Sequence, residues 1–360
     1  MKFRIVHTTQ YEYSAPAIES YSELRVRPRN TLRQVITNHV TEVTPRVPLE
    51  VFTDYWGNWG ESLSVPFRHQ RLTVTSRCTV QTRPFQDALE GLDLSISEAA
   101  HLCLPKRREL YDFLMPSPLI QITPQVEALA RKHLASKAPF PESILGLNEF
   151  IFRNFKYQPG ATTISTPVDE VIETRQGVCQ DFAHLYIAIL RAAGIPARYV
   201  SGYIETESQA DASRAGHDIA ELHDAVSPHA PLSERPAPRK ARNGNGAKRP
   251  ASGLRPHTDA PLIGATASHA WVEVYAPNGL WVGIDPTNNM MESERHVQIG
   301  IGRDYSDVPP LRGVFKGAKK QILSVKVTVA RTPGEAEGTA PSASALSSPQ
   351  EIPLAPPLVG

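Results

Sequence analysis

The first 85 residues alternate between apolar and polar positions with the two-residue period of β-strands. Prolines interrupt this pattern repeatedly, and Asp-Tyr-Trp-Gly-Asn at 54–58 is typical of a turn between two strands. The β-rich runs lie at residues 3–13, 35–43, 49–52 and 72–80. The pattern predicts a small antiparallel β domain over residues 1–85.

A helical period follows after a connecting segment at 86–122. Apolar residues recur at helical spacing over 124–136 and 142–155, and a proline at 124 suits a first helical turn. A third apolar run, 182–193, is closed by a glycine and then a proline, which are helix stop signals. The run at 197–204 is predicted to be a strand.

Two segments lack the composition of a packed structure. Residues 206–266 contain no Phe, Tyr or Trp and are rich in Ala, Pro, Arg, His and Gly. Such a segment cannot bury enough apolar surface to offset its ordering entropy, so we predict a disordered insertion. The Pro/Ala/Ser-rich tail, 331–360, is predicted to be disordered as well. The remaining helices and strands define a core at 123–330, with the insertion inside it.

Two strands after the insertion bring a histidine and an aspartate onto one face. They are predicted at 268–275 and 280–285, with a Pro-Asn-Gly turn signal between them. If the aliphatic rows of both strands face one core, even positions pair with even positions and odd with odd. His269 then lies directly opposite Asp285, which requires an odd-length loop or a bulge at 275–279.

Cys179, just before the apolar run 182–193, supplies a nucleophile for this pair. A helix N-terminus offers unpaired N–H groups and the positive end of the helix dipole, and both favour a thiolate. His269 would take the thiol proton, and Asp285 would hold the imidazole in the required tautomer. We predict that these three residues are catalytic. The alternatives are a structural cysteine and an ordinary cross-strand His–Asp pair.

Aromatic residues near the predicted site are candidates for contacting a substrate. Tyr157 would donate to an oxyanion together with the backbone N–H of Cys179, or would be a core aromatic residue. Trp271 and Trp281 share the predicted histidine face. They would either form the wall of a cleft or pack against the next element.

No metal or cofactor is predicted. Histidines recur every six residues in the insertion, but this spacing matches neither a helical face nor a zinc finger. No loop carries the dense, alternating carboxylates that calcium requires. On the predicted cysteine helix, Asp181 would cap the first turn, and His184 is expected to be a packing residue.

Composition narrows the class of partner. The formal net charge is +1, so no global field points to nucleic acid or to an acidic membrane surface. The basic tract of the insertion lacks interleaved aromatic residues and is interpreted as a solvated linker. Three scattered cysteines suit a reducing compartment, and the N-terminus lacks the apolar stretch of a signal peptide. We predict a cytoplasmic protein without a nucleic-acid or membrane partner.

The chain resembles bacterial transglutaminase-like proteins of the papain-like cysteine-enzyme group. The resemblance covers about residues 1–330 apart from the insertion, and the first 85 residues resemble the N-terminal β domain of that family. The blocks that carry it are Gly-Val-Cys-Gln-Asp-Phe at 177–182, Ala-Arg-Tyr-Val-Ser-Gly-Tyr at 197–203, Ser-His-Ala-Trp-Val-Glu at 268–273, Asp-Pro-Thr-Asn at 285–288 and Gly-Arg-Asp-Tyr-Ser-Asp-Val at 302–308.

The resemblance implies an α+β fold in which a helix carrying the cysteine packs on an antiparallel sheet. It implies Cys179 as nucleophile, His269 as base and Asp285 as the third member of a triad. A thioester on the cysteine would pass to an amine in a cross-linking acyltransferase, or to water in a protease or amidase. A non-catalytic scaffold is the remaining alternative. The insertion is longer than the connection that such relatives usually have at this point.

Overall fold

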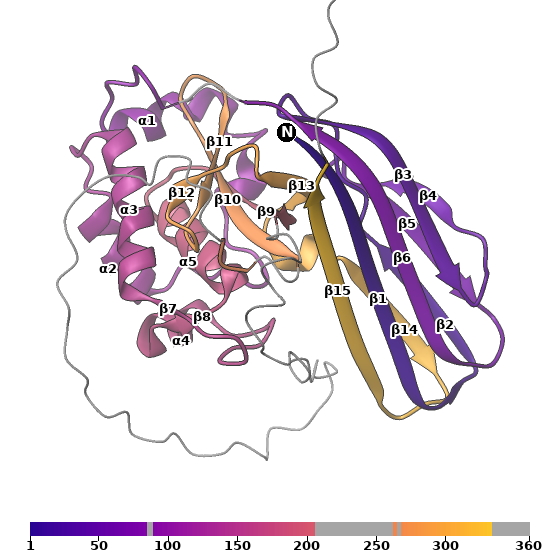
Figure 1. Ribbon diagram of the computed structural model, residues 1–360. Helices are drawn as coiled ribbons and strands as arrows, with labels where there is room; N and C mark the ends of the chain where they lie inside the picture. The colour runs from indigo at the N-terminus through magenta and orange to yellow at the C-terminus, as the bar shows by residue number, and fades with distance from the viewer. Residues whose placement is uncertain (85–88, 206–261, 265–267, 333–360) are drawn as a thin grey trace, which may run out of the picture.

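The protein consists of a β-sandwich packed against a mixed α+β core (Figure 1). The five-stranded sheet of the core lies between the core helices and the sandwich. The insertion predicted at 206–266 and the tail are largely outside the described part of the chain. This computed structural model describes residues 1–84, 89–205, 262–264 and 268–332.

The sandwich is built from two four-stranded antiparallel sheets, ordered β15-β1-β6-β3 and β14-β2-β5-β4. The alternating pattern of residues 1–85 does form strands, as predicted, and the alternate apolar side chains meet between the sheets. The turn predicted at 54–58 connects two of them. These strands are β1 (Lys2–Ala17), β2 (Glu19–Leu24), β3 (Gln34–Thr44), β4 (Glu50–Thr53), β5 (Trp59–Val65) and β6 (His69–Thr82).

The last two strands of the chain complete the sandwich. β14 (Leu311–Lys316) pairs with β2, and β15 (Gln321–Arg331) pairs with β1 over its whole length. The sequence interpretation had placed these residues in the core at 123–330. The structure assigns them elsewhere because a local two-residue period identifies a strand but not its partner. The two ends of the described chain therefore lie side by side in one sheet.

The core contains five α-helices in the described part of the chain and a five-stranded sheet ordered β12-β11-β10-β9-β13. The helices are α1 (Ile96–Leu102), α2 (Pro124–His133), α3 (Phe140–Asn154), α4 (Val168–Thr174) and α5 (Cys179–Ala192). The sheet strands are β9 (Ala197–Ile204), β10 (His269–Tyr275), β11 (Trp281–Asp285), β12 (Met290–Met291) and β13 (His296–Gly302), and a parallel pair, β7 (Lys156–Tyr157) and β8 (Gln176–Gly177), lies apart from it. Short 3₁₀ turns occupy Leu104–Lys106, Tyr111–Phe113 and Tyr305–Asp307. Helix α1 lies in the segment that the sequence assigned to a connection.

Helix α5 is the central helix of the core. Its residues from 181 to 191 are all buried, because the sheet and the helices α2, α3 and α4 surround it. The sheet presents Val272, Val274 and Ile284 to the same apolar cluster. The helix begins at Cys179, where a helix N-terminus was predicted, and Gly194 follows it with φ +77°, as the stop signal predicted.

The β10–β11 hairpin partly confirms the predicted register. Val272 pairs with Ile284 and Tyr275 with Trp281, so even positions do pair with even positions across a five-residue loop. Continuing this register sets Asp285 opposite Trp271, not opposite His269. The predicted direct pairing is therefore wrong by two positions, although both residues do lie on the same face of the hairpin.

The sandwich binds the outer edge of β13, the last strand of the core sheet, mainly through side-chain carboxamides. Gln34 donates to the Gln298 carbonyl at 2.7 Å and accepts from the Gln298 N–H at 2.8 Å. Asn58 does the same with Ile301, at 2.8 and 2.9 Å. An edge strand presents unpaired backbone groups, and here the carboxamides take the place of a neighbouring strand.

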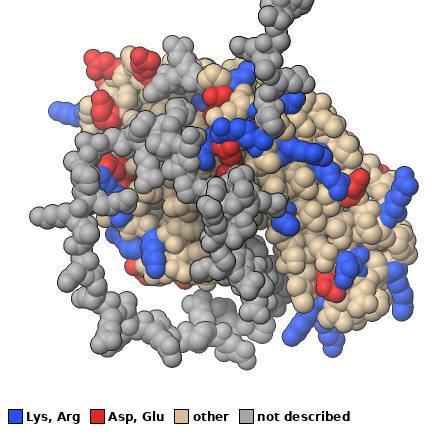
Figure 2. Space-filling model, in the orientation of Figure 1, with Lys and Arg blue, Asp and Glu red and all other residues tan. Residues whose placement is uncertain are grey.

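Charged side chains also join the two halves. Glu205, at the end of β9, accepts from both Arg295 and Arg331, the latter on β15 of the sandwich. Acidic and basic side chains lie side by side along the junction in Figure 2. Within the described residues, no helix has the length and apolar character needed to cross a membrane.

We predict that Gln34→Leu lowers the free energy of unfolding by about 1–3 kcal/mol, because the buried Gln298 N–H loses its acceptor and the Gln298 carbonyl keeps only the Arg29 N–H at 3.1 Å. Urea denaturation followed by circular dichroism measures the change. Gln81→Leu, at an exposed position of β6, is the matched control and is expected to change it by less than about 0.5 kcal/mol. Equal effects of the two substitutions would contradict the role of the carboxamide.

Candidate active site

Cys179 is held at the first position of α5 by its neighbours. The β7–β8 pair fixes the segment before it, with Gly177 opposite Tyr157. Asp181 accepts from the Val178 N–H at 2.8 Å and so caps the first turn, as predicted. A Cβ on Gly177 would lie 2.8 Å from the Asp181 Cβ, so only glycine fits there. The cysteine itself is partly exposed.

His269 and Asp285 meet although they are not directly paired. Nε2 of His269 lies 2.9 Å from Oδ2 of Asp285, and both side chains are fully buried. Nδ1 of the same ring has no hydrogen-bond partner among the described residues. Because Nε2 is engaged by the carboxylate, Nδ1 is the ring nitrogen left for the thiol of Cys179.

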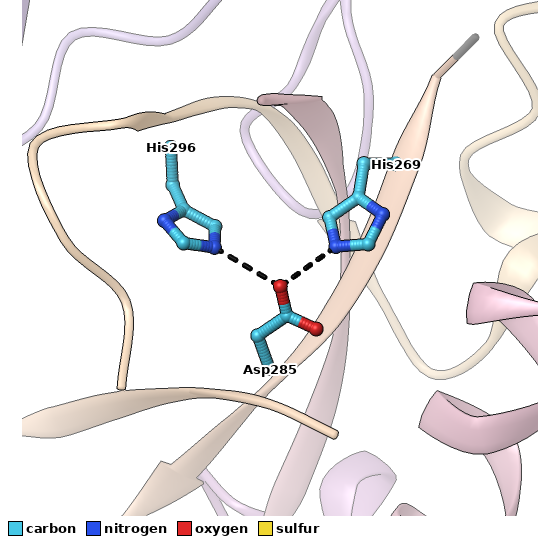
Figure 3. A group of neighbouring side chains, drawn as sticks. All are labelled: His269, Asp285 and His296. Carbon is cyan, nitrogen blue, oxygen red and sulfur yellow. Dashed lines mark hydrogen bonds and ion pairs between the residues drawn. The ribbon is translucent and has the colours of Figure 1, made fainter. Parts of the chain in front are cut away.

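The Asp285 carboxylate is surrounded by donors. Oδ1 accepts from the backbone N–H groups of Thr287 and Asn288, at 2.9 and 3.2 Å. Oδ2 accepts from the Asn288 side chain at 2.7 Å, in addition to His269. A second imidazole, that of His296, lies 3.2 Å from the same oxygen (Figure 3). The orientation of the carboxylate is therefore determined by several elements at once.

The electrostatics of the pair follow from this arrangement. Burial alone would lower the pKa of His269, but the charge and hydrogen bond of Asp285, with a contribution from Cys179, raise it to about 10. Burial alone would raise the pKa of Asp285, but His269 and His296 hold it well below its usual range. The Asp285 carboxylate thus stabilises the protonated form of the His269 ring.

Sequence reasoning missed His296. It begins β13, eleven residues after Asp285, and no local period connects the two positions. The three side chains of Figure 3 lie close enough together for their ligand atoms to surround an ion. However, both Nε2 atoms and the Asn288 amide point at one carboxylate oxygen, so hydrogen bonds account for the cluster without an ion.

The residues next to Nδ1 leave little space. Gly264, at the end of the insertion, has φ +88°, and a Cβ on it would lie 3.0 Å from Nδ1 and 3.7 Å from the Tyr157 hydroxyl. Asn288 holds this segment by accepting from the Ile263 N–H at 2.7 Å and donating to its carbonyl at 3.3 Å. The Tyr157 hydroxyl and Gly264 thus lie on the Nδ1 side of the His269 ring.

The two tryptophans are packing residues. Trp271 is fully buried against Val200 and Ile301, and its ring lies beside the His269 ring. It is therefore closed to a substrate in this structure, and the cleft-wall interpretation is not supported. Trp281 packs in a separate cluster with Tyr275. His184 is also buried, as expected, and accepts from the Tyr305 N–H at 3.2 Å.

The fold and the site together define a protein of the papain-like cysteine class: a cysteine at a helix N-terminus and a His–Asp pair on an antiparallel sheet. A family model described as the transglutaminase-like superfamily matches residues 127–286, and one for the bacterial transglutaminase-like N-terminal region matches residues 3–81. The chain belongs to the transglutaminase-like superfamily.

Relatives of this chain include one of almost equal length. An uncharacterized protein of Mycobacterium tuberculosis is 33% identical over 344 residues, which cover 93% of this chain and 94% of the relative. A protein-glutamine gamma-glutamyltransferase of Pseudomonas aeruginosa is 25% identical over 171 residues, 46% of this chain and 18% of that protein. The crystal structure of a presumed cysteine protease from Cytophaga hutchinsonii has a TM-score of 0.64 at 22% identity, with 92% of each chain covered, and supports the fold.

Alkylation by iodoacetamide at pH 7, followed by mass spectrometry of the peptide containing Cys179, tests the thiol–imidazole interaction. His269→Ala is expected to slow the reaction by about tenfold or more, because an unassisted cysteine carries only a few per cent thiolate at this pH. Burial raises the pKa of Cys78 to about 12, so its peptide serves as an unreactive internal standard. Equal rates at Cys179 in both proteins would show that the pair does not activate the thiol.

The pH dependence of stability tests the His269–Asp285 pair. The pKa of His269 is raised from 6.5 to about 10, so its contribution is complete below pH 6.5 and is lost as the pH rises through about 10. The lowered pKa of Asp285 makes its contribution present above pH 3.8 and lost at lower pH. The melting temperature of wild type should therefore exceed that of Asp285→Asn most at about pH 5–6 and progressively less towards pH 9–10. A gap that widens with pH would contradict this assignment.

Proposed function

We propose that the protein is a cysteine acyltransferase that acts on carboxamide or isopeptide-type amides of proteins and peptides. One observation carries the proposal: His269 is bound to a buried carboxylate through Nε2, while Nδ1 is without a described partner and the Cys179 thiol raises its pKa. A thiol and an imidazole arranged in this way form the nucleophile and acid–base pair of covalent amide chemistry.

The proposed reaction has two steps. The Cys179 thiolate attacks the amide carbonyl, the C–N bond breaks, and Nδ1 of His269 gives its proton to the leaving nitrogen. A thioester remains on the sulfur. An acceptor amine then attacks this thioester, gives a proton to Nδ1, and leaves with the acyl group, which regenerates the thiolate. Asp285 supports the imidazolium in both steps.

The negative oxygen of each tetrahedral intermediate needs donors about 3 Å away. The first N–H groups of a helix have no intrahelical partner, and Cys179 occupies the first position of α5. We propose its backbone N–H as one donor and the Tyr157 hydroxyl as the second. Burial, with the nearby charge of Cys179, raises the pKa of Tyr157, so this hydroxyl keeps its proton and can donate.

Hydrolysis is the alternative within the same chemistry, because water can resolve the thioester in place of an amine. Gly264 and Tyr157 lie on the Nδ1 side of the ring, and the products of the assay below distinguish an amine acceptor from water. A non-catalytic scaffold would have no need for a charged His–Asp pair buried beside a partly exposed thiol.

The test incubates the protein with unfolded casein and a dansylated primary amine, and identifies products by mass spectrometry. We expect the amine on glutamine side chains, an activity that Cys179→Ala abolishes and Asp285→Asn lowers on the order of 10⁴-fold. His133→Ala, far from the site in sequence and on α2, is a matched control that should retain the activity. Deamidated or cleaved casein without bound amine would favour hydrolysis, and products that persist in Cys179→Ala would contradict the mechanism.

A further inference from the structure

The site contains a second buried imidazole that the proposed reaction does not use. His296 is the first residue of β13, and its side chain is as completely buried as that of His269. Nε2 of His296 lies 3.2 Å from Oδ2 of Asp285, the oxygen that His269 approaches at 2.9 Å. Figure 3 shows the two rings on either side of the carboxylate.

The backbone determines the tautomer of His296. Nδ1 of this ring lies 3.2 Å from the backbone nitrogen of Ser293 and 3.3 Å from its hydroxyl. A backbone N–H can only donate, so Nδ1 accepts, and the proton of the neutral ring is on Nε2. His296 therefore donates to Asp285 from a fixed position.

His296 also stays neutral while His269 is charged. Burial lowers the pKa of His296, the Asp285 carboxylate opposes this, and the positive charges of His269 and Arg295 lower it further. These are the charged groups that face it: Asp285 from β11, His269 from β10 and Arg295 from its own segment. Arg295 is itself paired with Glu205 at the end of β9. Trp271 covers the ring with its centroid at 5.2 Å.

One oxygen of Asp285 thus accepts hydrogen bonds from two imidazoles, that of His269, which is charged, and that of His296, which is neutral. Each donor that a carboxylate accepts stabilises the negative charge and weakens its hold on the other protons around it. Without the His296 donor, Asp285 would still accept from Thr287 and Asn288, so it would remain in place. It would then hold the His269 imidazolium more strongly.

We propose that His296 is a positioning residue for the acyl-transfer reaction: its neutral ring holds Oδ2 of Asp285 and limits how strongly that carboxylate, bound to Nε2, stabilises the His269 imidazolium and so the proton on Nδ1. This inference rests on the proposed function, in which His269 must release its proton to a leaving nitrogen. An acid that holds its proton too firmly transfers it slowly. The His296 ring therefore keeps Asp285 and His269 oriented while His269 can still give up its proton.

The experiment compares His296→Phe and His296→Gln by long-range ¹H–¹⁵N NMR of the histidine rings. Both substitutions are made in the Cys179→Ala protein, because Cys179 raises the pKa of His269 and its removal brings the titration to a lower pH. Phe removes the donor and keeps a ring, whereas the Gln Nε2 can donate from the same place. His133→Phe, at a partly buried histidine on α2, is the matched control.

We expect three results. With His296 intact, its signals show a proton on Nε2 and no charging between about pH 5 and 9. In His296→Phe, the midpoint of the His269 titration rises by about 0.5–1 on the pH scale. A shift of this size corresponds to the free energy of roughly one lost hydrogen bond. His296→Gln restores the midpoint, and His133→Phe leaves it unchanged.

A proton on Nδ1 of His296, or an unchanged His269 midpoint in a folded His296→Phe protein, would overturn the proposal. If His296→Phe does not fold, the tautomer and the His296→Gln midpoint decide, because Gln is required to match the parent protein. The measurement uses no substrate. It therefore separates this inference from the acyl-transfer proposal, which the casein assay tests alone.

Discussion

The buried carboxylate of Asp285 is the constraint on which the site depends. An ionised carboxylate with a fully buried side chain is stable only if donors replace the water that it has lost. The donors come from the start of β10, the start of β13 and the turn after β11. The hairpin, the crossover to β13 and the turn must therefore all be in place before the charge is compensated. A site assembled in this way is coupled to the folding of the whole core.

Polar side chains also form hydrogen bonds with backbone groups at other places where no neighbouring strand or helix pairs with them. The carboxamides of Gln34 and Asn58 pair with both backbone groups of a residue on β13, and Asn288 does so with Ile263. The first two join the sandwich to the edge of the core sheet. Asn288 also contacts Asp285, so the carboxylate is linked to the segment beside Nδ1 of His269. The sandwich therefore supports the strand from which His296 projects.

The local pattern of apolar and polar residues predicted most of the secondary structure, and its wrong predictions have physical causes. A period of 2 or 3.6 and the stop signals around Gly194 located most strands and the cysteine helix, since these signals act within a few residues. The pairing of even with even and odd with odd positions in the hairpin was predictable, because one face of the hairpin must be apolar. The two-position offset of Asp285 was not, because the loop length decides it. The pairing of β15 with β1 and the place of His296 depend on contacts between residues distant in sequence, which no local period records.

The burial of the His–Asp pair also determines which residues of the site a substrate can contact. Both side chains of the pair are closed to solvent, including Nδ1 of His269, so the accessible member of the site is the partly exposed Cys179. At the Nδ1 edge of His269, Gly264 stands where any side chain would come within 3.0 Å of Nδ1. Position 264 therefore requires glycine for two reasons: its φ is positive, and a Cβ there would crowd Nδ1. The identity of the residue at position 264, outside the Cys–His–Asp set, therefore determines how much space remains beside Nδ1 of His269.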